Sequence, residues 1–118
     1  MIFKEAFEEF LKKLQKASKE NIVLVEGIKD KRALASLGIQ NIMTLKKPMY
    51  AVVEDIVASG KGCILLTDLD KKGKELYSRL SSKLKHFGVT IDNSFREFLF
   101  RTKLRQIEGI THYRERMK

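Results

Sequence analysis

Apolar residues along the chain follow two alternating patterns, helical spacing and short continuous runs. Near the N-terminus, apolar side chains recur at steps of four, three and four, at Phe3, Phe7, Phe10 and Leu14. This spacing predicts a helix with one buried face. The run at 22–25 is apolar and rich in β-branched residues, which is typical of a strand buried on both faces.

The rest of the chain continues this alternation. Strands are predicted at 22–25, 42–45 and 63–66, with a fourth at 89–91. Helices are predicted before Asn21, between Gly27 and Gly38, at 50–59, between Gly73 and Gly88, and at 95–107. Such an order predicts a three-layer α/β/α fold with a mostly parallel sheet of about four strands, in which the first and third strands are neighbours. We expect a single domain over 1–118, made of an N-terminal helix (1–20), an α/β core (21–91) and a basic C-terminal helix and tail (92–118).

Carboxylates follow two of the predicted strands. Glu26 comes directly after the first strand, with Asp30 four residues further on, and Asp68 and Asp70 follow the third. Because right-handed crossovers place the C-terminal ends of parallel strands at one edge of the sheet, we expect these four side chains to converge there. Neighbouring carboxylates raise one another's pKa unless a cation lies among them, and Mg²⁺ is a cation that takes such oxygen ligands.

The spacing of these residues suggests separate tasks. Asp68 and Asp70 are two residues apart, so both can reach one ion where the extended chain begins to turn. Glu26 arrives from the adjacent strand and can relay a proton. Gly27 and Gly73 remove side-chain bulk where backbone or phosphate must come close. We therefore expect Mg²⁺, or Mn²⁺ in its place, as cofactor.

Positive charge is concentrated in the second half of the chain. The sequence has 24 Lys and Arg against 15 Asp and Glu, a formal net charge of +9. Residues 71–91 contain six basic residues and one acidic residue, and 92–118 contain seven and four. Basic residues beside a carboxylate–metal cluster suit a polyanion, so we expect RNA or DNA as partner. The expected phosphate-binding residues are Lys71, Lys72, Lys74, Arg79, Arg101 and Arg105.

Taken together, the two acidic motifs resemble those of the toprim domain. An apolar strand ending in Glu26-Gly27, with Asp30 four residues after the glutamate, is followed by a strand ending in Asp68-x-Asp70-x-x-Gly73. This domain occurs in bacterial primases, topoisomerases, overcoming-lysogenization-defect nucleases and small ribosomal RNA maturases. The resemblance covers roughly 20–110, and the stretch 96–109 is similar to the maturase-type proteins.

The resemblance implies specific roles for these residues. Glu26 would be the general acid or base, Asp68 and Asp70 would coordinate magnesium, and Asp30 would join the metal site. A primase would need a zinc-binding region that one cysteine cannot supply, and no tyrosine is marked as a topoisomerase nucleophile. The expected function is thus a small Mg²⁺-dependent nuclease, acting alone or with a protein partner.

Simpler interpretations exist for the same residues. Asp30 can cap its helix, and Asp68 and Asp70 can cap the helix that follows them. The basic helix can be a solvated face. A haloacid-dehalogenase-type phosphatase also has an Asp-x-Asp after a buried strand, but Lys72 stands where that family has Thr or Val. A different class of function is a non-catalytic nucleic-acid-binding module that keeps the acidic cluster.

Other features narrow the setting of the protein. The single cysteine, Cys63, lies in an apolar strand and is expected to be an inert core thiol. His86 and His112 have no partner at zinc-ligand spacing. No apolar run approaches the ~20 residues needed to cross a bilayer, and the first residues do not form an apolar signal segment. We expect a cytoplasmic protein with no membrane partner.

Overall fold

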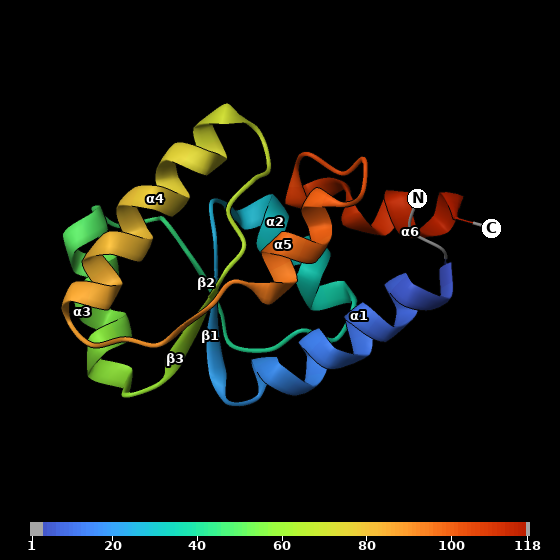
Figure 1. Cartoon of the computed structure of the whole chain (residues 1–118). Coiled ribbons are helices and arrows are strands. Elements are labelled where there is room, and N and C mark those ends of the chain that lie inside the picture. The colour runs from blue at the N-terminus through green and yellow to red at the C-terminus, as the bar shows by residue number, and fades with distance from the viewer. Residues whose placement is uncertain (1–3, 118) are drawn as a thin grey trace.

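A four-stranded parallel sheet lies at the centre of the structure, a computed structural model that describes residues 4–117 (Figure 1). Its strands are β1 (Asn21–Val25), β2 (Ile42–Thr44), β3 (Gly62–Leu65) and β4 (Ile91–Asp92). They lie in the order β2-β1-β3-β4, and every neighbouring pair is parallel. The predicted α/β class and the adjacency of the first and third strands are confirmed.

Helices cover both faces of this sheet. They are α1 (Lys4–Ser18), α2 (Ile28–Ser36), α3 (Met49–Ser59), α4 (Lys71–His86), α5 (Ser94–Phe100) and α6 (Ile110–Arg116), with a 3₁₀ turn η1 (Ile107–Gly109). α3 and α4 lie on one side of the sheet, and α1, α2 and α5 lie on the other (Figure 1). The chain therefore forms the predicted three layers. No helix within residues 4–117 has the length and apolar character needed to cross a membrane.

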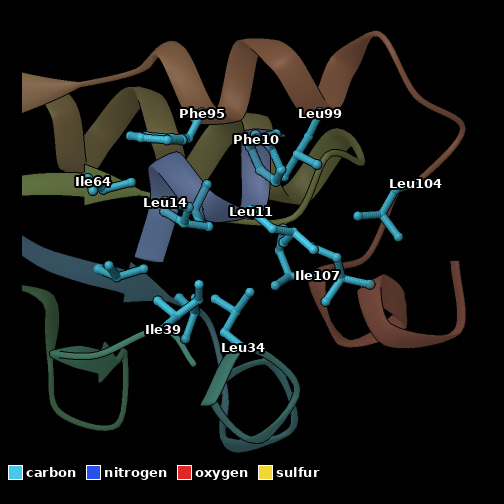
Figure 2. Packing of buried hydrophobic residues seen from close by; sticks show 14 of the residues in the cluster. Phe10, Leu11, Leu14, Leu34, Ile39, Ile64, Phe95, Leu99, Leu104 and Ile107 are labelled. Atoms are coloured by element: carbon cyan, nitrogen blue, oxygen red, sulfur yellow. The ribbon is translucent and has the colours of Figure 1, made fainter. Parts of the chain in front are cut away.

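Two hydrophobic clusters hold the layers together. Alternate strand residues enter opposite clusters, because successive side chains of a strand point to opposite faces. Leu24 and Leu65 meet α3 and α4, while Val25 and Ile64 meet α1, α2 and α5. Figure 2 shows the cluster that Val25 and Ile64 enter, in which Phe10 of α1 lies against α5. The predicted core face of α1 is confirmed for Phe7, Phe10 and Leu14; Phe3 lies outside the described residues.

The C-terminal segment differs from the single helix predicted over 95–107. α5 ends at Phe100 because the Thr102 hydroxyl donates to the Leu99 carbonyl at 2.6 Å and accepts the Leu104 N–H at 3.1 Å, which turns the chain. Leu104 and Ile107 nevertheless enter the same apolar cluster as Leu99 (Figure 2). The prediction of one helix over 95–107 is therefore wrong: the chain forms α5 and, after a turn, η1 and α6.

The last helix returns to the first. The Glu8 carboxylate on α1 accepts hydrogen bonds from Arg114 Nε and Nη2 on α6, at 2.8 and 2.5 Å. Beside this pair, the Phe7 and Tyr113 rings lie 5.6 Å apart between centroids. Contacts across more than a hundred residues therefore join α1 to α6.

Candidate active site

The candidate site lies where the strand order reverses. From β1 the chain proceeds to β2 on one side, whereas β3, on the other side of β1, leads outward to β4. The C-terminal ends of β1 and β3 therefore flank a topological switch point, which is the usual ligand position in open α/β sheets. Glu26 follows β1 and Asp68 follows β3, and the Glu26 Oε2 accepts the Asp68 backbone N–H at 2.8 Å. The predicted convergence of the two motifs is confirmed at this pair.

Asp68 lies at the centre of the acidic group. Its Oδ1 accepts the Ile107 backbone N–H at 2.8 Å, and its side chain is partly buried. Burial, together with the negative charges of Glu26, Asp30 and Asp70, raises the pKa of Asp68 to about 6 against the opposing effect of the Ile107 hydrogen bond. Glu26, Asp30 and Asp70 are thus each close enough to Asp68 to act on it electrostatically.

Asp30 and Asp70 also have structural partners. Asp30 Oδ2 accepts the Gly27 backbone N–H at 3.0 Å at the start of α2, and the residue is 6% exposed. Asp70 is the N-cap of α4, where its Oδ1 accepts the Gly73 N–H at 2.8 Å. The capping interpretation is therefore confirmed for both residues, and it is compatible with a further role in metal binding for their other oxygen atoms.

The segment after Thr102 also borders the site. The Leu69 N–H donates to the Arg105 carbonyl at 2.8 Å, and Gln106 Nε2 donates to Asp70 Oδ2 at 3.4 Å. Glu108 lies near Asp30, where its charge adds to the burial that raises the pKa of Asp30. The sequence pointed to this segment only through Arg105 and the maturase-like stretch 96–109, because the backbone groups that make most of its contacts with the site have no sequence signature.

Arg96 on α5 was also missed as a site residue. Its guanidinium donates to the carbonyls of Thr67, through Nε at 3.3 Å, and of Asp68, through Nη2 at 2.9 Å. The group lies 4.5 Å from the Tyr77 ring centroid and 4.8 Å from that of Phe100, and the residue is 5% exposed. Arg96 thus fixes the backbone that carries Asp68. The sequence signal for this role is weak: Arg96 lies among the phenylalanines of a predicted helix, with Glu97 beside it.

The predicted phosphate-binding residues fall into two groups. Lys71, Lys72 and Arg79 lie on α4 and form no ion pair with any described residue; both lysines are exposed. The others contact protein groups: Lys74 lies over the Phe100 ring, Arg101 lies over the Phe98 ring, and Arg105 donates to the Thr102 and Leu104 carbonyls. All six residues are exposed, and the structure leaves Lys71, Lys72 and Arg79 on α4 without an ion-pair partner among the described residues.

Of the two glycines singled out, only Gly73 lies in a crowded position. A Cβ built on Gly73 would be 1.8 Å from the Asp68 carbonyl oxygen, so the backbones of the turn and of α4 touch here. At Gly27 the nearest atom would be Asp30 Oδ2, at 4.0 Å. Close backbone approach therefore explains Gly73, while the space at Gly27 is open.

The donor atoms at this edge fit Mg²⁺ in an open site. Within residues 4–117, no three Asp, Glu, His or Cys side chains are grouped so as to hold an ion between them. Magnesium, however, is commonly bound through one or two carboxylates while it keeps several waters and a substrate phosphate. Asp68 best meets that requirement, because its Oδ2 accepts no hydrogen bond within the described chain. Asp70 is the nearest second candidate along the same turn.

Cys63 has no part in this arrangement. The residue is fully buried in β3, and burial raises the pKa of its thiol to about 12. A protonated, inaccessible thiol is a poor nucleophile and metal ligand, so the expectation of an inert core cysteine is confirmed.

The fold and the carboxylate edge define the class of protein: a three-layer α/β protein with an acidic site at its switch point. No family model matches the chain. Among curated proteins, it is 31% identical to a UPF0292 protein of Thermococcus gammatolerans over 111 residues, which cover 92% of this chain and 84% of the relative. A UPF0292 protein of Pyrococcus abyssi is 33% identical over 105 residues, covering 88% and 78%. The chain belongs to the UPF0292 family.

A solved structure supports the fold independently. A protein of Aquifex aeolicus is 36% identical in sequence and superimposes with a TM-score of 0.82, covering 86% of this chain and 95% of that chain. Because the match spans nearly the whole length of both chains, the arrangement of strands and helices is shared. The similarity therefore extends from α/β class to the complete fold.

Proposed function

We propose that the chain is a Mg²⁺-dependent nuclease of the toprim type, which cleaves phosphodiester bonds of RNA or DNA in the cytoplasm. The observation that carries the proposal is the 2.8 Å hydrogen bond from the Asp68 N–H to Glu26 Oε2 at the switch point. It fixes a carboxylate beside the residue best suited to hold magnesium. The toprim resemblance of the two motifs, and the basic start of α4 next to them, point to the same chemistry.

Each residue has a distinct part in the proposed reaction. Mg²⁺ held through Asp68, with Asp70 as second candidate, would neutralise negative charge on the scissile phosphate. Glu26 keeps Oε2 on the Asp68 N–H, so its Oε1 is the atom that exchanges a proton with the attacking water or the leaving oxygen. Lys71 and Lys72 bind flanking phosphates without reading bases.

The substitution Glu26→Gln tests the acid–base role. The amide carbonyl of the new side chain still accepts the Asp68 N–H, so the fold and nucleic-acid binding should persist. The cleavage rate should fall by roughly 10²–10⁴, the usual contribution of a general acid or base. The measurement uses labelled single- and double-stranded RNA and DNA, each with Mg²⁺, Mn²⁺ or chelator.

The matched control is Glu54→Gln, which makes the same chemical change at an exposed position on α3. Its cleavage rate should equal that of the unchanged protein. Equal rates for both variants would remove Glu26 from the reaction. If no substrate is cut with either metal, the nuclease proposal fails.

Replacing Asp68 with asparagine tests the metal site through stability. The pKa of Asp68 rises from 3.8 to about 6 on folding, so ionisation destabilises the folded state above about pH 6, on the order of 2–3 kcal/mol. Below about pH 3, well under the unfolded pKa, the residue is protonated in both states and the penalty vanishes. In chelator, Asp68→Asn should therefore be more stable than the unchanged protein at about pH 8, and equally stable at about pH 3.

Magnesium should cancel most of that difference. At 100 times its dissociation constant, Mg²⁺ should raise the free energy of unfolding of the unchanged protein by about 2.7 kcal/mol, and that of Asp68→Asn much less. Denaturant titrations measure both effects. The control Asp55→Asn changes an exposed carboxylate on α3 and should respond to magnesium like the unchanged protein. Identical magnesium responses in all three proteins would contradict a site at Asp68.

A non-catalytic nucleic-acid-binding module is the second candidate function. It is favoured by the helix-capping hydrogen bonds of Asp30 and Asp70, because these give both carboxylates a structural role that requires no metal. The cleavage panel separates the two functions. Salt-sensitive binding of several nucleic acids, without cleavage under any metal, would support the binding module.

A further inference from the structure

A hollow lies beside Glu26, on the side of the site away from α4, and a second hollow adjoins it. The first has a volume of about 290 Å³ and is lined by Glu26, Gly27, Ile28, Lys31, Thr44 and Lys46. The second, of about 320 Å³, shares Lys31, Thr44 and Lys46 with the first and continues towards α3. Together they form a depression over the C-terminal end of the edge strand β2, which we call the β2 groove.

The β2 groove combines positive charge with apolar surface. Lys31 on α2 and Lys46 after β2 stand between the two hollows, are exposed, and form no ion pair within residues 4–117. Asp55 in the second hollow is neutralised by Lys47, whose Nζ lies 2.9 Å from Asp55 Oδ2. Ile28, which lines the first hollow, is 51% exposed. Such a surface suits a ligand with both phosphates and apolar rings.

The position of the groove suggests a route across the site. The basic start of α4 follows β3, whereas the β2 groove lies on the other side of β1. The acidic edge formed by Glu26 and Asp68 therefore lies between two groups of free lysines. A phosphodiester chain bound by both groups of lysines would pass over the acidic edge, and this would place its scissile bond beside Glu26 and Asp68.

We propose that the β2 groove binds a single-stranded segment of the substrate, with Lys31 and Lys46 on its phosphates and Ile28 against a base or sugar. Each hollow is small for a ligand pocket. Its apolar atoms can pack against an unstacked base of a single strand, whereas the bases of a duplex are stacked and not accessible to it. A positively charged groove that follows the backbone is the usual way to bind a single strand. This inference rests on the proposed function, because it extends the same site to its substrate.

The experiment measures binding in chelator, where cleavage does not occur. Probes of about 12 nucleotides, a length within the span of single-strand binding sites, are used as fluorescent single-stranded RNA and DNA and as a hairpin duplex. The double variant Lys31→Ala/Lys46→Ala should bind single strands about 20-fold more weakly at about 0.1 M salt, with a salt slope reduced by about 1.4. Lys31→Arg/Lys46→Arg should restore binding, since arginine also pairs with phosphate.

The matched control is Lys19→Ala/Lys61→Ala, which removes the same charge just before β1 and β3, at the opposite edge of the sheet. It should change single-strand affinity by less than about threefold, because distant exposed charges are screened. Equal losses of single-strand affinity in both double variants would overturn the proposal that the β2 groove binds a single strand. A larger loss of affinity for the duplex than for single strands would also overturn it. Absence of salt-sensitive binding by the unchanged protein would overturn it as well.

The result is independent of the cleavage test. If Glu26→Gln cuts as fast as the unchanged protein while the lysine variants lose single-strand binding, the catalytic proposal fails and the groove stands. If cleavage depends on Glu26 but binding does not depend on Lys31 and Lys46, the nuclease stands and the groove is overturned.

Discussion

Replacing Gly73 with alanine should destabilise the protein by about 3–5 kcal/mol, at the upper end for a point substitution. The added methyl group would lie 1.8 Å from the Asp68 carbonyl oxygen and 2.4 Å from its carbon, both backbone atoms. The backbone cannot easily move, because Gly73 donates to Asp70 Oδ1 and its carbonyl accepts the Thr67 hydroxyl at 2.8 Å. Denaturant unfolding followed by circular dichroism measures the change.

Gly27→Ala provides the matched control at the other motif. Gly27 has φ −144°, which any residue adopts, and an added Cβ would meet no atom closer than 4.0 Å. The loss should therefore stay below about 1 kcal/mol, the effect of a less favourable N-cap. Equal midpoints for the two variants would contradict the close contact between α4 and the turn after β3.

Arg96→Met should destabilise the protein by about 3–4 kcal/mol. The substitution keeps an apolar side chain between Tyr77 and Phe100 but leaves the buried carbonyls of Thr67 and Asp68 without their donors. Each unsatisfied buried group costs about 1–3 kcal/mol. Arg96→Lys keeps the positive charge but lacks the planar guanidinium that donates to both carbonyls. It should therefore recover only part of the lost stability. Denaturant unfolding, with and without magnesium, measures both stability and the state of the turn that carries Asp68.

Arg101→Met is the control for a neighbouring arginine. Arg101 is exposed and lies 5.8 Å from the Phe98 ring centroid, with no buried carbonyl to satisfy. Its replacement should cost less than about 1 kcal/mol, the value of an exposed cation–π contact. If Arg96→Met were as mild as this control, Arg96 would not be holding the turn.

The sequence was sufficient to predict the centre of the site. Apolar runs followed by acids, combined with the geometry of parallel sheets, were enough to bring Glu26 and Asp68 together. The pattern also identified Cys63 as a buried residue and the α1 phenylalanines as core. These predictions succeeded because they depend on strand direction and burial, which hydrophobic periodicity records directly.

The surroundings of the site could not be predicted in the same way. The contact between the Ile107 N–H and Asp68 depends on a turn at Thr102, and the helical spacing of 95–107 gave no sign of that turn. The task of Arg96 depends on carbonyl groups, which every residue carries. The lysines of the β2 groove lie in different elements, so only the folded chain shows that they are neighbours.

The ion pair between Glu8 and Arg114 has a consequence for how the chain can be rearranged. Because Arg114 on α6 contacts Glu8 on α1, a linker in place of the residues outside 4–117 could join the end of α6 to the start of α1, and new ends could be opened at Gly60, an exposed left-handed turn with φ 69°. In that circular permutant the strands would be synthesised in the order β3, β4, β1, β2, yet β1 would still lie beside β3. Glu26 and Asp68 would meet as before, because their pairing depends on position in the sheet and not on the order of synthesis.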